Sequence, residues 1–265
     1  MKRLLAILLL AAVSLTARAQ LELFPQGTPF PPLLADPAEP RLFLSQLAVK
    51  RAGGDFSAAF LGVGHDFGLL RWNDWQVSLF GSADSLFNLD LPGDALVNTD
   101  YRLGVPVAWR HGSWSARARA YHQSSHLGDE LILGGNAPPR VDLSYEAIDL
   151  LVAWQRAGLR LYGGASHVVR SRTESYEGSG LHYGLDYVSA PALFGLRLTA
   201  GIDLKWLEPA RPHSAVSAKA GIKLARESHE RGITLLIELY DGFAPFGQFF
   251  VEEFRYRGAR LQFDL

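Results

Sequence analysis

The chain has 265 residues, 48% of them hydrophobic, with a formal net charge of −1 at pH 7 and no cysteine. The near-neutral charge argues against a nucleic-acid partner, which favours a strongly basic face, and the sequence has no phosphate-binding glycine loop or nucleotide motif. A protein of this size without disulfides has to be stabilised by its own hydrogen bonds and packing.

The first 19 residues have the features of a signal peptide. Lys2 and Arg3 form a basic start, residues 4–13 form a short apolar run, and residues 17–19 (ARA) form a small-residue cleavage site. The apolar run is too short to span a bilayer as a stable helix. We therefore expect export of the chain, with cleavage before Gln20.

Residues 20–40 are rich in proline. The prolines are Pro25, Pro29, Pro31, Pro32, Pro37 and Pro40. Proline has no backbone N–H and restricts the residue before it, so the segment predicts an extended leader rather than sheet or helix. We expect this leader to lie in the periplasm.

From residue 41 to residue 265, apolar and polar residues alternate with period two, which indicates strands with two different faces. About twelve such segments follow one another. They are residues 41–51, 55–66, 76–88, 101–111, 113–124, 141–156, 159–170, 180–189, 194–206, 215–225, 232–242 and 254–265. Most are long for a globular strand and suited to crossing a bilayer at a tilt.

The connections between these segments are mostly short on one side and longer on the other, as in bacterial outer-membrane barrels. The sequence therefore predicts an all-β protein, an antiparallel transmembrane β-barrel of about twelve strands of the outer-membrane type. A periplasmic β-sandwich is the alternative. In a barrel the charged face lines the lumen, which is either crossed by ion pairs and water or open as a narrow solute pore.

The stretch 113–130 combines a membrane strand with a polar cluster. Its first part, WSARARAY, alternates like a barrel strand, and HQSSH follows directly at residues 122–126. An apolar band of about 25 Å takes about ten residues of a tilted strand to cross. Counted from Trp114, this depth places His122 and Ser124 on the lipid face at the level of the outer headgroups. Polar groups there are costly unless they have a partner or a role.

The next predicted strand supplies such a partner. Glu146 shares the lipid-facing parity and lies across from His122 in an antiparallel hairpin. A serine hydroxyl, an imidazole that takes its proton and a carboxylate that orients the imidazole form the arrangement needed for nucleophilic acyl transfer. Ser124 is then the candidate nucleophile, His122 the base and Glu146 the orienting group, with the acyl ester of an outer-membrane lipid as substrate. Asp129 and Glu130 offer hard oxygen ligands of the kind that Ca²⁺ prefers.

The residues His122-Gln123-Ser124 resemble the start of the His-x-Ser-Asn-Gly motif of the outer-membrane phospholipase A family. Ser125-His126 stands here where that motif has Asn-Gly. The resemblance implies a twelve-stranded barrel with a His–Ser pair on its outer wall and hydrolysis of lipid esters.

Four blocks along the chain are similar to a family of bacterial envelope proteins known as domain of unknown function 1207. The blocks are FPPLLADPAEPR (30–41), NLDLPGDALVNTDYRLGVP (88–106), YHQSSHLGDE (121–130) and DLSYEAIDLLV (142–152). This resemblance implies an exported envelope protein and assigns no activity. From the signal peptide and the barrel pattern we expect the protein to be located in the bacterial outer membrane.

Other interpretations of the polar cluster stay open. The HQSSHLGDE stretch can simply begin an outer loop that is held by its own hydrogen bonds. A transition metal bound by His122, His126 and Asp129 is a further alternative, although this spacing converges poorly on a strand. A non-enzymatic barrel, either a narrow channel or a structural envelope component, is the alternative to a lipid hydrolase.

Overall fold

The computed structural model describes residues 21–135, 139–173, 176–207, 213–225 and 231–264, so the predicted signal peptide lies outside the described residues. The strands are β1 (Leu21–Leu23), β2 (Leu42–Arg51), β3 (Phe56–Trp72), β4 (Trp75–Asn88), β5 (Ala95–His111), β6 (Trp114–Leu127), β7 (Ser144–Arg156), β8 (Leu159–Ser171), β9 (Gly178–Val188), β10 (Leu196–Leu207), β11 (His213–Ala225), β12 (Gly232–Phe243) and β13 (Glu253–Asp264). The helical elements are α2 (Asp129–Leu133) and the 3-10 turns η1 (Leu193–Gly195) and η2 (Gly247–Phe249). Within the described ranges, no helix is long and apolar enough to cross a membrane.

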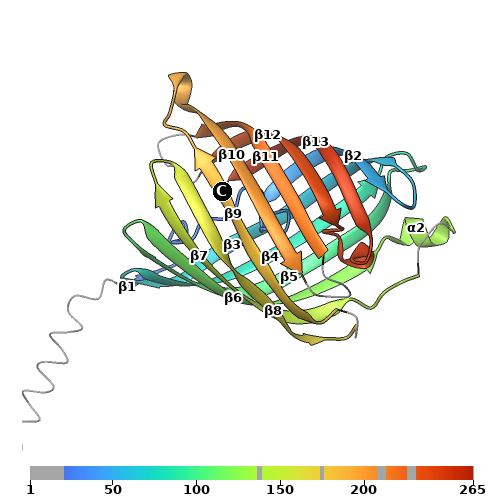
Figure 1. Ribbon diagram of the computed structural model, residues 1–265, viewed down its shortest axis with the longest axis horizontal. Helices are drawn as coiled ribbons and strands as arrows, with labels where there is room; N and C mark the ends of the chain where they lie inside the picture. Colours follow the sequence, from blue (N-terminus) through green and yellow to red (C-terminus); the bar gives the residue numbers. More distant parts are fainter. Residues whose placement is uncertain (1–20, 136–138, 174–175, 208–212, 226–230, 265) are drawn as a thin grey trace, which may run out of the picture.

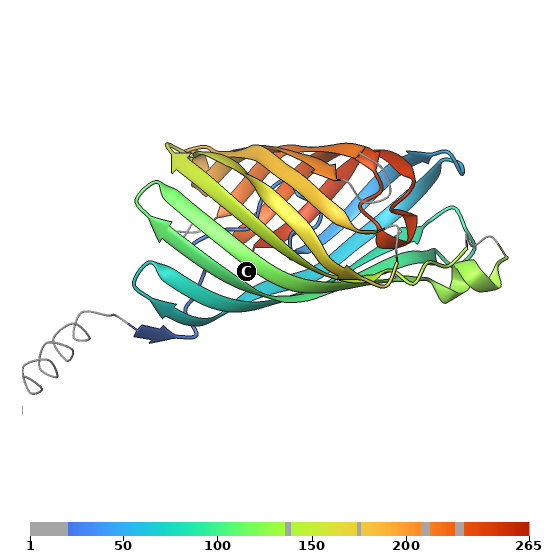
Figure 2. The ribbon, with the colours of Figure 1, turned by 60° about the horizontal axis from the view of Figure 1, so that its bottom comes forward.

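Strands β2 to β13 form a closed antiparallel barrel of twelve strands (Figures 1 and 2). Strand β2 pairs with β13 on one side and with β3 on the other, so that Leu44 lies opposite both Leu261 and Leu61. The short β1 adds to the end of β3. Closure gives every strand of the barrel a hydrogen-bonded neighbour on each side, which is the condition for strands to lie within a membrane. The predicted fold class is confirmed.

The barrel wall has an apolar outer face and a polar inner face. On β7, the exposed fractions of Ile148 and Leu150 are 50% and 53%, whereas Asp149 between them is buried. The charged residues that the alternation predicts to be inside the barrel all follow the inward parity. They are Arg117, Arg119, Arg160, Arg197, Lys205, Lys219, Lys223, Arg260, Asp149, Asp186, Asp203, Glu238 and Asp264.

The end of the barrel with the short turns carries a group of tryptophans. Trp72 and Trp75 stack across the β3–β4 turn with their ring centroids 6.0 Å apart, and Trp109 lies 6.3 Å from Trp75. Trp114 and Trp154 lie opposite each other at the corresponding ends of β6 and β7. Aromatic side chains favour the membrane interface, so this end marks one boundary of the apolar belt.

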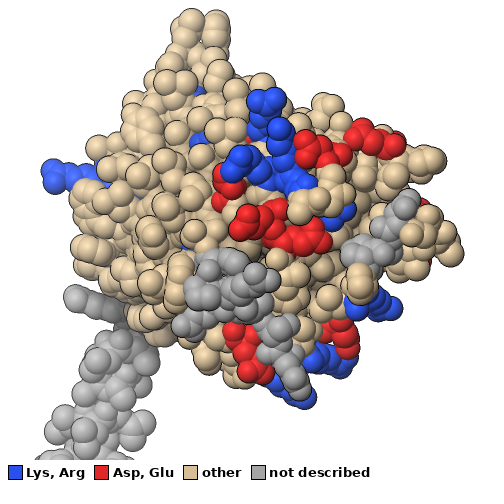
Figure 3. Space-filling view, turned by 45° about the vertical axis from the view of Figure 1, so that its right-hand side comes forward, with Lys and Arg blue, Asp and Glu red and all other residues tan. Residues whose placement is uncertain are grey.

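The opposite end carries the longer connections, including α2 and η2 (Figure 1). Figure 3 turns this end toward the reader and shows acidic and basic side chains gathered on it, beside a wall that is largely free of them. The ion pairs Arg255–Asp241, at 2.8 Å, and Arg51–Glu252, at 3.1 Å, belong to this end. In an outer-membrane barrel this is the outer end.

Two strands are longer than the alternation predicts. Strands β3 and β5 each span 17 residues. Strand β5 begins at Ala95 rather than near residue 101, because Asn98 and Asp100 remain paired with both neighbouring strands. Their polar side chains point into the barrel, where they are buried.

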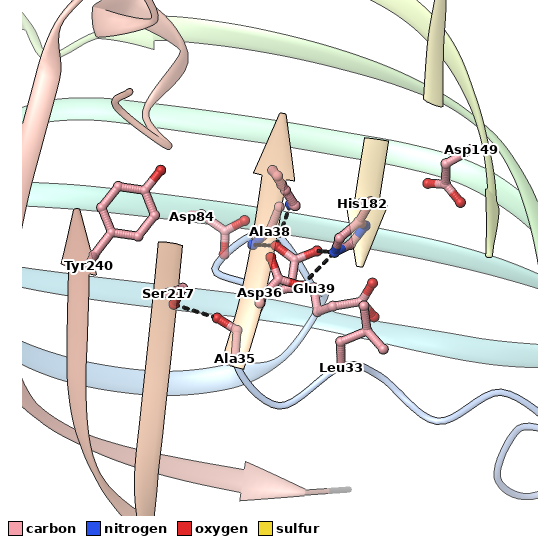
Figure 4. Close-up of polar contacts among 12 residues, drawn as sticks. Leu33, Ala35, Asp36, Ala38, Glu39, Asp84, Asp149, His182, Ser217 and Tyr240 are labelled. Carbon is pink, nitrogen blue, oxygen red and sulfur yellow. Dashed lines mark hydrogen bonds and ion pairs between the residues drawn. The ribbon is translucent and has the colours of Figure 1, made fainter. Parts of the chain in front are cut away.

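The proline-rich segment lies inside the barrel and not in the periplasm as predicted. Residues 25–40, called the plug below, pass into the lumen from the end with the short turns (Figures 1 and 4). Phe30, Leu33 and Ala35 are completely or almost completely buried. The Ser217 hydroxyl on β11 donates a 2.7 Å hydrogen bond to the Ala35 carbonyl.

The composition of the plug explains why it is stable inside a polar lumen. Proline carries a carbonyl acceptor without an N–H donor, and lumen arginines donate to these carbonyls. Arg160 donates to the carbonyls of Pro31 and Pro32 at 2.7 and 2.9 Å, and Arg110 donates to that of Pro29 at 2.8 Å. The plug carbonyls therefore supply hydrogen-bond acceptors to lumen arginines that are buried or half-buried.

Two acidic residues fix the inner end of the plug. Glu39 accepts hydrogen bonds from both terminal nitrogens of Arg117, at 2.7 and 3.0 Å, and lies 3.5 Å from Arg119. Burial acts to raise the pKa of Glu39, but the two arginines outweigh it and hold the pKa at about 2, below the ordinary value of 4.5. Asp36 accepts a 2.6 Å hydrogen bond from Lys205 on β10.

The connection between β12 and β13 folds into the outer mouth of the barrel. Phe246 and Phe249 are each 1% exposed. The Gly247 N–H donates to the Asp100 carboxylate at 3.1 Å, and the Gln248 side chain donates to the Ser125 carbonyl at 2.7 Å. The plug thus occupies the lumen from one end, and this connection occupies it from the other.

Candidate functional site

The candidate site lies on the outer wall, near the outer ends of β6, β7 and β8. The alternation of β6 turns the side chains of Arg119, Gln123 and Ser125 into the lumen, where they are buried. His122 and Ser124 take the opposite parity and are exposed and half-buried, respectively. The predicted outward position of both side chains is what the structure shows.

The antiparallel pairing of β6 and β7 brings His122 and Glu146 together. The two residues are direct partners in the register. The His122 Nδ1 and Glu146 Oε1 atoms lie 3.2 Å apart, and both side chains are about half exposed, at 46% and 49%. A carboxylate at Nδ1 favours the tautomer with its proton on Nδ1, in which Nε2 is an acceptor.

Ser124 follows His122 by two residues on the same face of β6, at a backbone spacing of about 7 Å. Its direct partner on β7 is Ser144. Among the hydrogen bonds of the described residues there is none between the Ser124 hydroxyl and His122. The hydrogen bonds of a catalytic site are often long without substrate and shorten when substrate binds.

A basic residue lies beside these polar side chains, and the four residues His122, Ser124, Glu146 and Arg170 are called the row below. Arg170 on β8 is the register partner of Glu146, and its side chain is exposed on the same wall. Its outward position was not predictable from the sequence, because simple alternation along β8 directs residue 170 into the lumen. A β-bulge beside Ala147 and Val168 adds one residue to β8 and reverses the parity beyond it.

Apolar side chains surround the row on the membrane side. Leu103 on β5 is the register partner of His122 and is 58% exposed, and Ile148 on β7 is 50% exposed. Nearer the outer ends of β5 and β6, the His126 and Tyr101 rings pack edge to face with their centroids 5.8 Å apart. The row thus stands where the apolar wall meets the aromatic and polar outer end.

The inward half of the same stretch is structural. Gln123 accepts hydrogen bonds from Arg102 at 2.8 Å and from the Tyr145 hydroxyl at 2.7 Å. The Ser125 hydroxyl donates to Asn98 at 3.0 Å. Strand parity therefore divides residues 122–125 into two sets. Gln123 and Ser125 form hydrogen bonds inside the lumen, whereas His122 and Ser124 face the membrane.

The residues proposed as calcium ligands lie apart from this row. Asp129 and Glu130 are exposed in the first turn of α2. Within the part of the chain that the structure describes, neither belongs to a group of three residues able to hold a metal ion, and the same is true of His122 and His126. A calcium ion at Asp129 and Glu130 stays a prediction.

A closed antiparallel wall, apolar outside and charged inside, defines this protein as a β-barrel of the outer-membrane class. The chain belongs to the family described as protein of unknown function DUF1207, whose family model matches residues 9–265. This confirms the resemblance found in the sequence.

Known structures of similar fold are outer-membrane barrels. Outer membrane phospholipase A from Escherichia coli is 12% identical, with a TM-score of 0.55, and the match covers 86% of this chain and 93% of that one. The Salmonella typhi phospholipase dimer with bound calcium gives the same identity and TM-score over 84% of this chain and 90% of that one. The KdgM porin is 10% identical with a TM-score of 0.47, over 83% of this chain and 98% of that one. No curated protein matches the chain. At these identities the likeness concerns the fold alone.

Proposed function

We propose that this barrel hydrolyses the acyl esters of membrane lipids at the outer leaflet, using Ser124, His122 and Glu146. The observation that carries the proposal is the 3.2 Å contact between His122 and Glu146 on the membrane-facing wall. An exposed carboxylate and imidazole are costly beside lipid. A catalytic role, in which Glu146 orients His122 as a general base, explains why these two polar side chains lie on the membrane-facing wall.

The chemistry follows from the position of the proton. Glu146 holds the Nδ1–H of His122, so Nε2 takes the proton from the Ser124 hydroxyl as Oγ bonds to the ester carbonyl carbon. The tetrahedral intermediate breaks the bond to the glycerol oxygen, which leaves with the proton from Nε2. Water then attacks the acyl-serine in the same way and releases the fatty acid, restoring Ser124.

The surroundings of the row suit a lipid substrate. Leu103 and Ile148 offer an apolar surface to the acyl chain on the membrane side. Arg170 lies across from Glu146 and offers a positive charge to the phosphate of a headgroup. A glycerophospholipid therefore fits the row with its ester between the two regions.

The test is release of fatty acid from phospholipid in mixed micelles by refolded protein. The Ser124→Ala variant should release no more fatty acid than the blank, and His122→Ala should lose a factor on the order of 10² to 10⁴. Glu146→Gln should lose less, because it keeps the shape of the orienting group. Ser144→Ala is the matched control, since Ser144 is the register partner of Ser124. Equal activity in Ser124→Ala and wild type would end the proposal.

The alternative is a non-enzymatic barrel. The plug and the β12–β13 connection occupy the lumen, which favours a closed structural barrel over an open pore. A channel would require the plug to leave. Planar-bilayer conductance of wild type and of a variant lacking residues 25–40 separates these two cases. Steady conductance by the wild type would identify an open pore, whereas a closed barrel should conduct only when residues 25–40 are removed.

A further inference from the structure

Inside the barrel, the plug meets the wall at a cluster of three potential metal ligands. Asp36 comes from the plug, His182 from β9 and Asp203 from β10, and one ligand atom of each lies within 4.8 Å of the others. The His182 Nε2 atom lies 2.5 Å from Asp203 Oδ2 and 3.9 Å from Asp36 Oδ2. Figure 4 shows Asp36 and His182 facing each other, with a dashed line between them.

The neighbours of the cluster keep the ligand atoms in place. Lys205 contacts Oδ1 of Asp36 at 2.6 Å, which leaves Oδ2 on the side of His182. The Tyr162 hydroxyl donates a 2.7 Å hydrogen bond to Asp203, and its ring packs edge-on against His182 with the centroids 5.7 Å apart. Such contacts orient metal ligands in proteins.

A cavity of about 140 Å³ borders the cluster. Asp36, His182 and Asp203 all line it, between the plug and the β12–β13 connection. Asp149 lines the same cavity with a buried Oδ1 that has no hydrogen-bond partner among the described residues. The cavity leaves room for a water ligand, and the bare carboxylate oxygen favours a cation or a donor group in it.

The donor types also favour a cation. Asp36 and Asp203 bring two carboxylates into a lumen where ions are poorly solvated, and among the described residues Lys205 is the one lysine or arginine that forms an ion pair with either of them. One imidazole nitrogen and two carboxylate oxygens suit a divalent transition metal better than calcium, which prefers oxygen alone.

We propose that Asp36, His182 and Asp203 bind one divalent transition-metal ion, such as Zn²⁺, which ties the plug to the barrel wall. Zinc bonds to nitrogen and oxygen are about 2.0–2.2 Å long, so the ligand atoms need to move by about 1 Å or less. Binding replaces the hydrogen bond between His182 and Asp203, and the displaced Nε2 proton goes to solvent. The fourth position goes to water from the cavity.

The probe is Zn²⁺ added to metal-free, refolded full-length protein. After removal of free ion, elemental analysis should find one zinc per chain, and Ca²⁺ at the same concentration should not be retained. His182→Ala and Asp203→Asn should each lose at least tenfold in zinc affinity. His111→Ala is the matched control, because His111 is exposed at the end of β5 and pairs with Asp74 at 2.8 Å rather than with the cluster.

A second measurement reports the plug itself. The chain has no cysteine, so Leu34→Cys gives a single thiol in the plug. Zn²⁺ should slow its reaction with a maleimide at least tenfold, and this slowing should vanish when His182→Ala is added. Wild type that retains no zinc, retention of Ca²⁺ instead of zinc, or full zinc binding by folded His182→Ala would each overturn the proposal.

Discussion

The ion pair between Glu39 and Arg117 should decide whether the plug stays docked in the lumen. The perturbation is Glu39→Gln, which keeps the size of the side chain and removes its charge. Arg117 then stays buried, with an exposed fraction of 4%, and without its carboxylate. A buried charge that loses its partner is strongly destabilising.

The structure gives the magnitude in two ways. Burial alone would raise the pKa of Glu39, yet Arg117 and Arg119 bring it from 4.5 to about 2. At about 1.4 kcal/mol for each tenfold change, this fall corresponds to about 3 kcal/mol of docking free energy. Breaking a buried ion pair by removing one partner costs about 3–5 kcal/mol. The first route predicts that the undocked population rises by a factor on the order of 100, and the second by a factor on the order of 10² to 10⁴.

The assay is the rate at which a maleimide reacts with Leu34→Cys in the folded barrel. Leu34 is 8% exposed in the docked plug, and cysteine is smaller than the leucine it replaces. Adding Glu39→Gln should raise the reaction rate by a factor on the order of 100. The matched control is Asp241→Asn, which removes the exposed ion pair to Arg255 and costs about 1 kcal/mol or less.

Two results would contradict this role of the ion pair. One is that Glu39→Gln leaves the labelling rate within threefold of its parent while the barrel stays folded, and the other is that Asp241→Asn raises the rate as much. In either case the ion pair at Glu39 does not hold the plug.

Three further predictions concern the plug and the outer wall. Because the pKa of Glu39 is held at about 2 against 4.5, docking should be constant above pH 4.5 and weaken as pH falls from 4.5 toward 2; labelling of Leu34→Cys with an acid-active pyridyl disulfide, divided at each pH by the rate for a free thiol, measures it. Phe30→Ala should cost about 3–5 kcal/mol of docking, because the ring is buried with the Arg117 and Arg160 guanidinium carbons 5.0 and 5.7 Å from its centroid; Phe30→Leu should keep most of the docking, and equal labelling of the two variants would contradict this. Arg170→Gln should raise KM for anionic phospholipid several-fold with little change in kcat, whereas Arg172→Gln, also exposed, should change neither.

Strand alternation carries most of the information about this fold. Strands β10 and β12 end within two residues of their predicted limits. Both keep an unbroken alternation between lipid and lumen, and in a barrel this alternation is imposed at every position of the wall. The same parity placed His122, Ser124 and Glu146 on the outer face, as the structure shows.

The plug was not predictable in this way. Its docking depends on lumen arginines on β5, β6 and β8, which are far apart in sequence and converge when the barrel closes. The sequence of the proline-rich segment does not indicate that its carbonyl and carboxylate oxygens accept hydrogen bonds from these arginines. Arg170 was missed for a local reason, because a β-bulge reverses the parity of β8 within the strand.

The position of a covalent adduct tests the proposed hydrolase most directly. Refolded protein is treated with a serine-reactive fluorophosphonate and the modified peptide is sequenced by mass spectrometry. The proposed mechanism predicts one adduct, on Ser124, that is lost in Ser124→Ala, strongly reduced in His122→Ala and retained in Ser144→Ala. An adduct on another serine, or none on folded wild type that is mixed with lipid, would contradict it.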